Sequence, residues 1–520
     1  MFHAMQQPST LHEPQSKLQF IEPDKVRTRF APSPTGFFHI GSARTALFNY
    51  LFAKKYNGIF VLRIEDTDRE RSKKEWEQDI QENMQWLGID WQEGPNKPGP
   101  FAPYRQSERK QIYKKHLEQL LNEGKAYYCF CEQSELDAYR QSLISANKPP
   151  LYSGKCRDLP ASQIKENIVN AKSYVIRFKM PAGKITFDDI LRGPIATDSE
   201  NFGDIVIAKN LDEPLYNFAC VVDDFLMKIT HIIRGEDHIS NTPKQILLAQ
   251  ALGFTSPKFL HLPLILDQQR AKLSKRNPEI MTAVSEYKKQ GFLPKALINF
   301  LALLGWNPGN QQEIFSLETL INEFSPEKIQ KSGAVFNPQK LEWINGMYIR
   351  QISLGHLTLL CLPYLIDRGL IQKTSLQEYK ITATDEKITF EYLCQIVGLY
   401  QERLKKLSEI SELADFFFKG NLTYGAELLI WKQTTDKELK SVLDKLTKLL
   451  SKIKPLDWSK QEIEKIIMPA AGKLKDRGKM LWPMRVALSG QKASAGPFEI
   501  AEVLGKEKTL QRVKEAKEKL

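Results

Sequence analysis

Residues 31–42, with the sequence APSPTGFFHIGS, connect an extended segment to a helix and constrain the fold more than any other part of the chain. Residues 26–30 before them are strand-like. After them, apolar residues recur at the spacing of one buried helix face, at Ala43, Ala46, Leu47, Tyr50 and Leu51. A turn at Asn57-Gly58 precedes a second strand at 59–64, which gives a β-loop-α-β unit of the doubly wound type. Free amides at the helix start and His39 can meet phosphate oxygens, so the unit predicts binding of a nucleotide triphosphate.

A Lys-rich segment supports this hypothesis. Lys272-Leu273-Ser274-Lys275-Arg276 places three cations within five residues, directly after the apolar stretch 259–266. A run of charge is usually a solvated surface, and a histidine at a helix start is usually a cap. Here, however, the cations follow a buried strand, where the active-site loops of open α/β sheets lie.

Together the two segments resemble the ATP motifs of class I aminoacyl-tRNA synthetases, with His39-Ile40-Gly41-Ser42 as the first motif and the Lys-rich segment as the second. Four further segments are similar to bacterial glutamyl-tRNA synthetases: RFAPSPTG at 29–36, RIEDTD at 63–68, VVDD at 221–224 and IRGEDH at 233–238. The resemblance covers nearly everything after about residue 25. Ser42 stands where the class motif ends in His, and Asn277-Pro278 stands where His-Gly is common in the family.

The resemblance implies an α/β fold: a Rossmann-like class I synthetase catalytic domain with an α+β insertion, followed by an all-helical anticodon-binding region. We expect a disordered extension at 1–24 and the first half of the catalytic domain at 25–125. The inserted acceptor-binding domain would occupy 126–213, and the second half of the catalytic domain 214–276. A helical stem-contact domain at 277–345 and a helical anticodon-binding domain at 346–520 would complete the chain.

Local patterns place the elements within this division. Residues 126–131, 174–178, 204–207 and 229–233 are strand-like, whereas strands nearly vanish beyond residue 280. The sequence Ser72-Lys73-Lys74-Glu75 predicts a capping box that opens a helix through about Leu87, and 106–122 is helical. A cap at Ser459 and apolar residues stepping by three and four from Leu439 to Ile453 predict two further helices.

Activation of an amino acid by ATP needs position and positive charge more than a side-chain base, because the substrate carboxylate is itself the nucleophile. By resemblance, the catalytic residues are His39, Gly41, Lys272, Ser274 and Lys275. The ATP-binding residues are Pro32, Ser33, His39, Gly41, Ser42, Glu236, Asp237, Lys272, Lys275 and Arg276, with Asp237 or Glu236 accepting from the ribose hydroxyls. Mg²⁺ would assist the departure of pyrophosphate.

Amino-acid choice needs a cation for a side-chain carboxylate. By resemblance, Arg234, at the end of the strand 229–233, pairs with the γ-carboxylate of glutamate, because an Arg fork binds a carboxylate bidentately. The rest of the substrate would be held by Arg29, Ala31, Ser33, Glu65 and Tyr216. The alternative for Arg234 is a surface salt bridge, the usual role of an arginine at a strand end.

Three cysteines form a candidate metal site. Cys129 and Cys131 are followed after 24 residues by Cys156, and three thiolates suit one structural Zn²⁺. We expect Asp158 as the fourth ligand, with Tyr152 as the alternative. Unlinked buried cysteines are the competing interpretation. Cys220, Cys361 and Cys394 stand alone in apolar surroundings and are interpreted as core.

Composition agrees with a tRNA enzyme. The formal net charge is +12, and residues 401–520 carry 25 Lys and Arg against 17 Asp and Glu, a net of +8, which suits a polyanion. No segment reaches the roughly 18 apolar residues of a membrane span. Six cysteines in 520 residues make no disulfide framework, so we expect the reducing cytoplasm as the compartment. We also expect a monomer without a membrane anchor.

The function predicted is ATP-dependent attachment of glutamate to tRNA(Glu) through a glutamyl-adenylate, with release of AMP and pyrophosphate. A non-discriminating enzyme that also charges tRNA(Gln) is one alternative. A nucleotidyltransferase or tRNA-modifying paralogue is another, although such chains generally lack a helical C-terminal half. A non-catalytic tRNA-binding protein would have no reason to keep His39, Arg234, Lys272 and Lys275 together.

Overall fold

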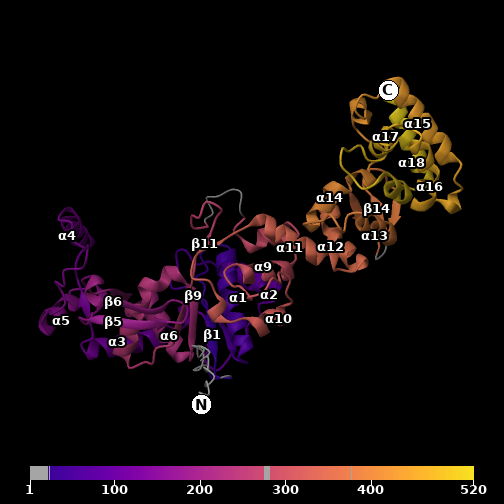
Figure 1. Ribbon diagram of the computed structural model, residues 1–520. Helices are drawn as coiled ribbons and strands as arrows, with labels where there is room; N and C mark the ends of the chain where they lie inside the picture. The colour runs from indigo at the N-terminus through magenta and orange to yellow at the C-terminus, as the bar shows by residue number, and fades with distance from the viewer. Residues whose placement is uncertain (1–21, 23, 274–280, 376–377) are drawn as a thin grey trace, which may run out of the picture. The chain divides into compact units, whose positions relative to one another are not determined.

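The computed structural model describes residue 22 and residues 24–273, 281–375 and 378–520. The chain forms two compact units (Figure 1). One comprises the described residues through Lys288 together with Pro294–Lys340, and the other comprises Lys289–Leu293 together with Leu341–Leu520. Nearly all of the predicted extension at 1–24 lies outside the described residues, as do Ser274, Lys275 and Arg276 of the Lys-rich segment.

The predicted β-loop-α-β unit opens the first compact unit. Strand β1 (Arg27–Phe30) pairs in parallel with β2 (Ile59–Leu62), and helix α1 (Ile40–Lys55) connects them. Most of α1 is buried, because helices α9 (Pro294–Leu303) and α10 (Leu317–Glu323) pack on it as well as the strands. Gly58 is required in the turn before β2, since a Cβ there would lie 2.2 Å from the carbonyl oxygen of Val26.

A four-stranded sheet continues the catalytic core, in the order β6-β5-β10-β9. Strand β9 (His231–Gly235) pairs in parallel with β10 (Lys258–Leu262), and the amide of Thr230, just before β9, donates to the carbonyl of Arg27 in β1. Burial of nearly every residue of β9 is typical of a parallel strand covered on both faces. Helices α3 (Lys110–Asn122), α6 (Tyr216–Leu226) and α7 (Thr242–Leu252) supply much of the surrounding apolar core.

The predicted insertion is divided between two sheets. Strands β3 (Ala126–Cys129), β4 (Val175–Phe178), β7 (Val206–Asn210) and β8 (Glu213–Pro214) form an antiparallel sheet, as the strand-like segments predicted. The hairpin of β5 (Lys184–Asp189) and β6 (Gly193–Asp198) was not predicted, although Ile185 and Phe187 alternate with polar residues in β5, as in a strand with one buried face. This hairpin joins β10 of the catalytic sheet, close to β9 in Figure 1. Helices α4 (Gln133–Ser145) and α5 (Ala161–Val169) complete the insertion.

Two predicted helix starts differ from the structure. Helix α2 (Lys74–Leu87) ends where predicted, but the capping box at Ser72 is wrong: the N-cap is Lys73, and no side chain caps the helix. The reason is local, because the amide of Ser72 donates to the carbonyl of Asp68 in the preceding turn. Helix α3 begins at Lys110 instead of 106, since Gln106–Glu108 form a 3₁₀ turn.

Beyond residue 280 the structure is mainly helical, as predicted, and it also holds short strands. The helices besides α9 and α10 are α8 (Val284–Lys289), α11 (Pro338–Arg350), α12 (Leu354–Asp367), α13 (Phe390–Gly398), α14 (Ile410–Leu413), α15 (Asp436–Ser451), α16 (Lys460–Gly472), α17 (Gly478–Ser489) and α18 (Pro497–Glu518). Strands β13 (Ile371–Lys373), β14 (Glu378–Ile381) and β15 (Lys387–Thr389) form a small antiparallel sheet, and β11 (Ile265–Leu266) pairs with β12 (Ala334–Val335).

Helices α15 and α16 confirm the two predictions for the C-terminal region. The apolar residues that recur at intervals of three and four along α15 are buried in the core of the second unit. They include Leu439, Leu443, Leu446 and Leu450. The hydroxyl of Ser459 accepts from the amide of Glu462 at the start of α16, as its sequence predicted. Helix α18 packs against both. Within the described residues, no helix has the length and apolar character needed to cross a bilayer.

Candidate active site

A cavity of about 1270 Å³ lies at the carboxyl ends of β1 and β9. It is the place that the doubly wound arrangement predicted for ligands. Most of the predicted residues line it: Arg29, Ala31, Pro32, Ser33, His39, Gly41, Ser42, Glu65, Tyr216, Arg234, Asp237 and Lys272. Glu236 is not among the lining residues. The fold thus brings together four segments that are far apart in the sequence.

His39 caps helix α1. Its Nδ1 accepts from the amide of Ser42 at 3.2 Å, and its Nε2 lies 3.0 Å from the Ser42 hydroxyl. Because Nδ1 accepts, Nε2 carries the proton of a neutral ring and donates to that hydroxyl. A Cβ at Gly41 would lie 3.1 Å from Nδ1, so a larger residue there would press on the ring. In this structure His39 therefore caps the helix, and it also lines the cavity.

Arg234 is buried at the end of β9 and is held on one side only. Its Nε donates to Nε2 of His261 at 3.2 Å, and its Nη2 donates to the hydroxyl of Thr242 at 2.7 Å. Its Nη1 is buried and finds no hydrogen-bond partner among the described residues. A surface salt bridge is excluded for this side chain, which is 5% exposed. An uncompensated guanidinium nitrogen beside a cavity suits an anionic ligand.

His261 and Thr242 were missed by the sequence analysis, as was Asp189. His261 lies on β10 next to Arg234 on β9, and the register of the two strands pairs them directly. Asp189 ends β5, and its carboxylate accepts from Nδ1 of His261 at 2.7 Å. No local sequence signal marks these residues, because they become neighbours only through strand pairing.

Behind the cavity lies a buried ionic cluster that links Arg29 and Glu65. Asp224 accepts from Nε of Arg29 at 3.1 Å and from Nη1 of Arg63 at 2.6 Å, and Nη2 of Arg63 donates to Glu65 at 2.9 Å. Burial alone would raise the pKa of Asp224, but the two guanidinium groups lower it to about 2. Burial outweighs the pull of Arg63 at Glu65 and raises the pKa of that carboxyl.

Asp223 extends this cluster away from the cavity. Its carboxylate accepts from Nε of Arg109 at 2.7 Å and from the hydroxyl of Tyr113 at 2.7 Å. Arg63 belongs to the segment RIEDTD, and Asp223 and Asp224 belong to VVDD. A signal was present, since Arg63, Asp223 and Asp224 stand among apolar residues, where charges occur only when paired.

The remaining polar groups at the rim are more exposed. Nζ of Lys272 lies 3.5 Å from Asp237, and both side chains are at least half exposed, so this pair contributes little to stability. The hydroxyl of Tyr216 lies 3.1 Å from Nδ1 of His238, and burial lowers the pKa of His238 to about 4. Glu236 instead accepts from the amide of Leu264 at 2.8 Å and pairs with Arg192. Of these two acidic residues, Asp237 lines the cavity and Glu236 does not.

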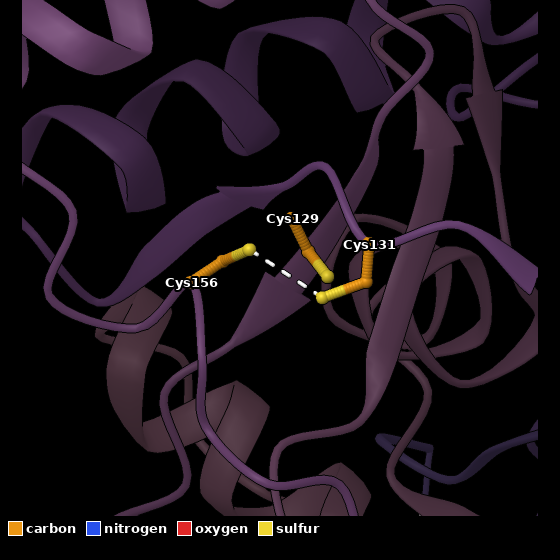
Figure 2. Close-up of side chains that lie close together, drawn as sticks. All are labelled: Cys129, Cys131 and Cys156. Atoms are coloured by element: carbon orange, nitrogen blue, oxygen red, sulfur yellow. Dashed lines mark hydrogen bonds between the residues drawn. The ribbon is translucent and has the colours of Figure 1, made fainter. Parts of the chain in front are cut away.

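The three predicted metal-site cysteines converge at the end of β3. Figure 2 shows the thiols of Cys129, Cys131 and Cys156 pointing toward one another, and their sulfur atoms lie within 4.8 Å. The hydroxyl of Tyr152 lies 3.4 Å from Cys129 Sγ and 3.5 Å from Cys131 Sγ. Asp158, the fourth ligand expected first, is not part of the group: its side chain is 84% exposed and pairs with Lys179 at 3.2 Å. Of the two expected fourth ligands, only Tyr152 lies near the thiols.

The doubly wound core, the helix that His39 caps and the helical C-terminal region together define a class I aminoacyl-tRNA synthetase. Residues 25–343 match the family described as tRNA synthetases class I (E and Q), catalytic domain, and residues 357–517 match an anticodon binding domain. The chain belongs to this family, within which its relatives are glutamate–tRNA ligases.

Similar proteins match over nearly the whole chain. The glutamate–tRNA ligase 1 of Caldicellulosiruptor saccharolyticus is 45% identical over 495 residues, which cover 94% of this chain and 98% of the relative. The glutamate–tRNA ligase of Bacillus subtilis is 41% identical over 494 residues, covering 94% and 99%. A solved glutamate tRNA ligase from Elizabethkingia meningosepticum, in complex with its amino acid, has a TM-score of 0.83 and 34% identity, covering 95% and 99%. The predicted family and fold class are confirmed.

Proposed function

We propose that this chain attaches glutamate to tRNA(Glu) in two steps, forming a glutamyl-adenylate from ATP and then an ester with the terminal tRNA ribose. The membership of the family and the similarity to glutamate–tRNA ligases over nearly the full length support the activity. The observation that carries the choice of amino acid is Arg234, a buried cation whose Nη1 has no partner among the described residues. AMP and pyrophosphate are the other products.

The activation step uses the cavity as a positioning device. The α-carboxylate of glutamate attacks the α-phosphorus of ATP, and charge develops on the departing pyrophosphate. His39, the helix start at Gly41 and Lys272 surround the place for the triphosphate, and Ser274, Lys275 and Arg276 follow Lys272 in sequence. Mg²⁺ supplies further neutralisation of the phosphates when it is bound.

Glutamate is held by charges of both signs. The γ-carboxylate faces the Nη1 and Nη2 edge of Arg234, and the buried carboxylate of Glu65 faces the α-ammonium group. Arg29, Ala31, Ser33 and Tyr216 line the same cavity and complete the pocket. Glutamine would present an amide donor to a guanidinium donor, so discrimination of roughly 10⁴ is expected, as in other sites built on polar complementarity.

Charging of purified tRNAs with labelled glutamate tests the proposal directly. We expect labelled tRNA(Glu) in the presence of ATP, with one AMP formed per glutamate attached. Labelling of tRNA(Gln) as well would identify a non-discriminating enzyme, and binding of tRNA without charging would identify a non-catalytic protein. The comparisons support neither alternative.

Arg234→Ala tests the assignment of the γ-carboxylate. The KM for glutamate should rise far more than the KM for ATP, because only the amino acid loses its counter-ion. Arg192→Ala is the matched control, since this arginine pairs with Glu236 and does not line the cavity. Equal losses for glutamate and ATP would show that Arg234 is structural.

We also propose one structural Zn²⁺ held by Cys129, Cys131, Cys156 and Tyr152. The donor set fits the metal, because tetrahedral coordination at about 2.3 Å places two sulfur atoms about 3.8 Å apart, and Cys131 and Cys156 lie 3.6 Å apart in the structure. Burial raises the pKa of Cys131 to about 12, so binding of the metal would release a proton there. The ion would tie β3 to the loop at Tyr152 and take no part in the chemistry.

Elemental analysis tests the metal. Protein purified without chelator should hold about one equivalent of zinc, and Cys156→Ser should release it. Cys394→Ser, a change at an isolated cysteine, should leave the zinc content unchanged. Absence of metal together with three freely reactive thiols would leave the interpretation of unlinked cysteines.

For tRNA, we propose that the insertion at 126–213 contacts the acceptor end, that 277–345 contacts the stem and that 346–520 binds the anticodon. The match of 357–517 to an anticodon binding domain and the net charge of +8 over 401–520 support this division. We further propose that the protein acts in the cytoplasm, in keeping with its six cysteines, which are all free. We also propose that it is a monomer.

A further inference from the structure

Four buried polar side chains form a chain of hydrogen bonds that ends on Arg234. Asp189 comes from β5, Arg234 from β9, His261 from β10 and Thr242 from the start of α7. His261 and Thr242 have no exposed surface, and Asp189 and Arg234 are 2% and 5% exposed. Burying such a network costs free energy unless every member is hydrogen-bonded. Its position beside the cavity therefore suggests a role in the site.

The carboxylate of Asp189 is saturated. Its Oδ1 accepts from the amides of Leu191 at 3.0 Å and Arg192 at 2.9 Å. Its Oδ2 accepts from the amide of His261 at 3.0 Å and from the Nδ1 of the same residue at 2.7 Å. The turn after β5 and the backbone of β10 thus fix the carboxylate, and the carboxylate in turn fixes the imidazole.

The orientation of the hydrogen bonds follows from the arginine. Nε–H of Arg234 can only donate, so Nε2 of His261 must accept, and the ring proton must lie on Nδ1, facing Asp189. Burial lowers the pKa of His261, against the opposing effect of Asp189, which keeps the ring in the neutral form that this arrangement needs. The hydroxyl of Thr242 accepts from Nη2 and lies 3.0 Å from Nε2 of His261.

The network therefore occupies the Nε edge of the guanidinium and one hydrogen of Nη2. Nη1 and the second hydrogen of Nη2 remain for a ligand, and together they form the end of the fork that binds a carboxylate through two parallel bonds. In the other tautomer of His261, the ring proton would lie on Nε2 and face the Nε–H of Arg234, which would bring two donors into contact. The guanidinium could not keep its orientation against such a contact.

We propose that His261 and Asp189 are positioning residues that orient Arg234 toward the side-chain carboxylate of the amino acid and thereby set the preference for glutamate over glutamine. This inference rests on the proposed role of Arg234. Because Asp189 lies on a strand of the insertion that pairs with the catalytic strand β10, the insertion contributes directly to the amino-acid site.

Two variants of His261 separate positioning from packing. In His261→Gln, the side-chain amide oxygen reaches the place of Nε2 and can still accept from Arg234. In His261→Asn, the amide reaches the place of Nδ1 and can still bond Asp189, but Arg234 loses its acceptor. Asp189→Asn provides a third test, because a donor opposite Nδ1 favours the wrong tautomer, the effect established for the aspartate of serine-protease triads.

The measurement is the KM for glutamate and for ATP in the charging reaction, with full-length enzyme. His261→Asn and Asp189→Asn should raise the KM for glutamate roughly 10- to 100-fold, as expected for a lost hydrogen bond to a charged group. The KM for ATP should stay within about twofold, and His261→Gln should recover most of the loss in glutamate KM. Discrimination against glutamine should also fall in His261→Asn and Asp189→Asn, and His261→Gln should retain most of it.

His231→Asn is the matched control. This histidine is also buried on the same sheet, but it contacts Thr230 and Phe52 and does not line the cavity. Equal losses for His261→Asn and His261→Gln, or parallel rises in both KM values, would overturn the positioning role. Asp189→Asn keeps the test decisive should His261→Asn not fold.

Arg234→Ala distinguishes failure of the proposed carboxylate contact from failure of the positioning role. If it leaves the KM for glutamate unchanged, the proposed carboxylate contact itself fails. If Arg234→Ala raises this KM and both His261→Asn and Asp189→Asn leave it unchanged, only the positioning role fails.

Discussion

Replacing Asp224 by asparagine is the sharpest test of the buried ionic cluster. The change keeps the size and one acceptor oxygen but removes a negative charge at a residue that is 3% exposed. Arg63 retains ion pairs with Glu65 at 2.9 Å and Asp223 at 3.9 Å, whereas Arg29 forms no second ion pair among the described residues. Arg29 would therefore be left as a buried cation beside the cavity, with no carboxylate in direct contact among the described residues.

The magnitude follows from this imbalance. Breaking a buried ion pair by removing one partner typically costs about 3–5 kcal/mol, because the remaining charge is uncompensated. We take about 3 kcal/mol, the lower end, because Asn still offers an acceptor oxygen and the cavity gives Arg29 some access to water. In a unit of more than 300 residues, with an unfolding entropy of about 2.1 cal/mol/K per residue, that loss lowers the melting midpoint by roughly 4–5 °C. Loss of orientation at Arg29 should also raise the KM for glutamate.

Differential scanning calorimetry of the full-length enzyme measures the melting midpoint. The transition that coincides with the loss of ATP binding identifies the unfolding of the catalytic unit. Asp188→Asn is the matched control, because this aspartate is exposed on β5 and has no part in the ionic cluster. A midpoint for Asp224→Asn within about 2 °C of the control would refute the reasoning, since the pair would then contribute no net stability.

Three further predictions follow from the site. Asp224 has a pKa of about 2 in the fold against 3.8 ordinarily, so its stabilisation is present above pH 4 and is lost as the pH falls toward 2; Asp224→Asn should lack this part of the acid dependence in a series of melting midpoints. Lys275→Ala should lower the activation rate by roughly 10²–10³ in single-turnover experiments with an unchanged melting midpoint, whereas an unchanged rate would make the Lys-rich segment a solvated charge run. Because the family resemblance suggests that adenylate formation needs tRNA, exchange of pyrophosphate into ATP with glutamate should require added tRNA, and vigorous exchange without it would contradict this.

The sequence was informative wherever a local pattern decides the structure. The turn at Asn57-Gly58, the loop at 31–42 and the stepped leucines of α15 each specify their element through neighbours within a few residues. One failure is local as well: Ser72 forms no capping box, because its amide is already bonded to the carbonyl of Asp68. A capping pattern competes with other turns of the same few residues, and the sequence does not rank them.

The sequence by itself thus determined the doubly wound unit, the helical C-terminal region and the identity of Arg234 and the three cysteines as functional candidates. Only the tertiary structure decided that β5 joins β10, which brings Asp189 to His261 and Arg234, and that Tyr152 instead of Asp158 lies at the thiols. It also decided that Arg29, Arg63 and Asp224 share one buried cluster. The physical reason is that these contacts join residues separated by 21 to 195 positions, on strands, helices and loops that meet only in the folded chain. Their energies depend on desolvation and strand register, which exist only once the chain has folded.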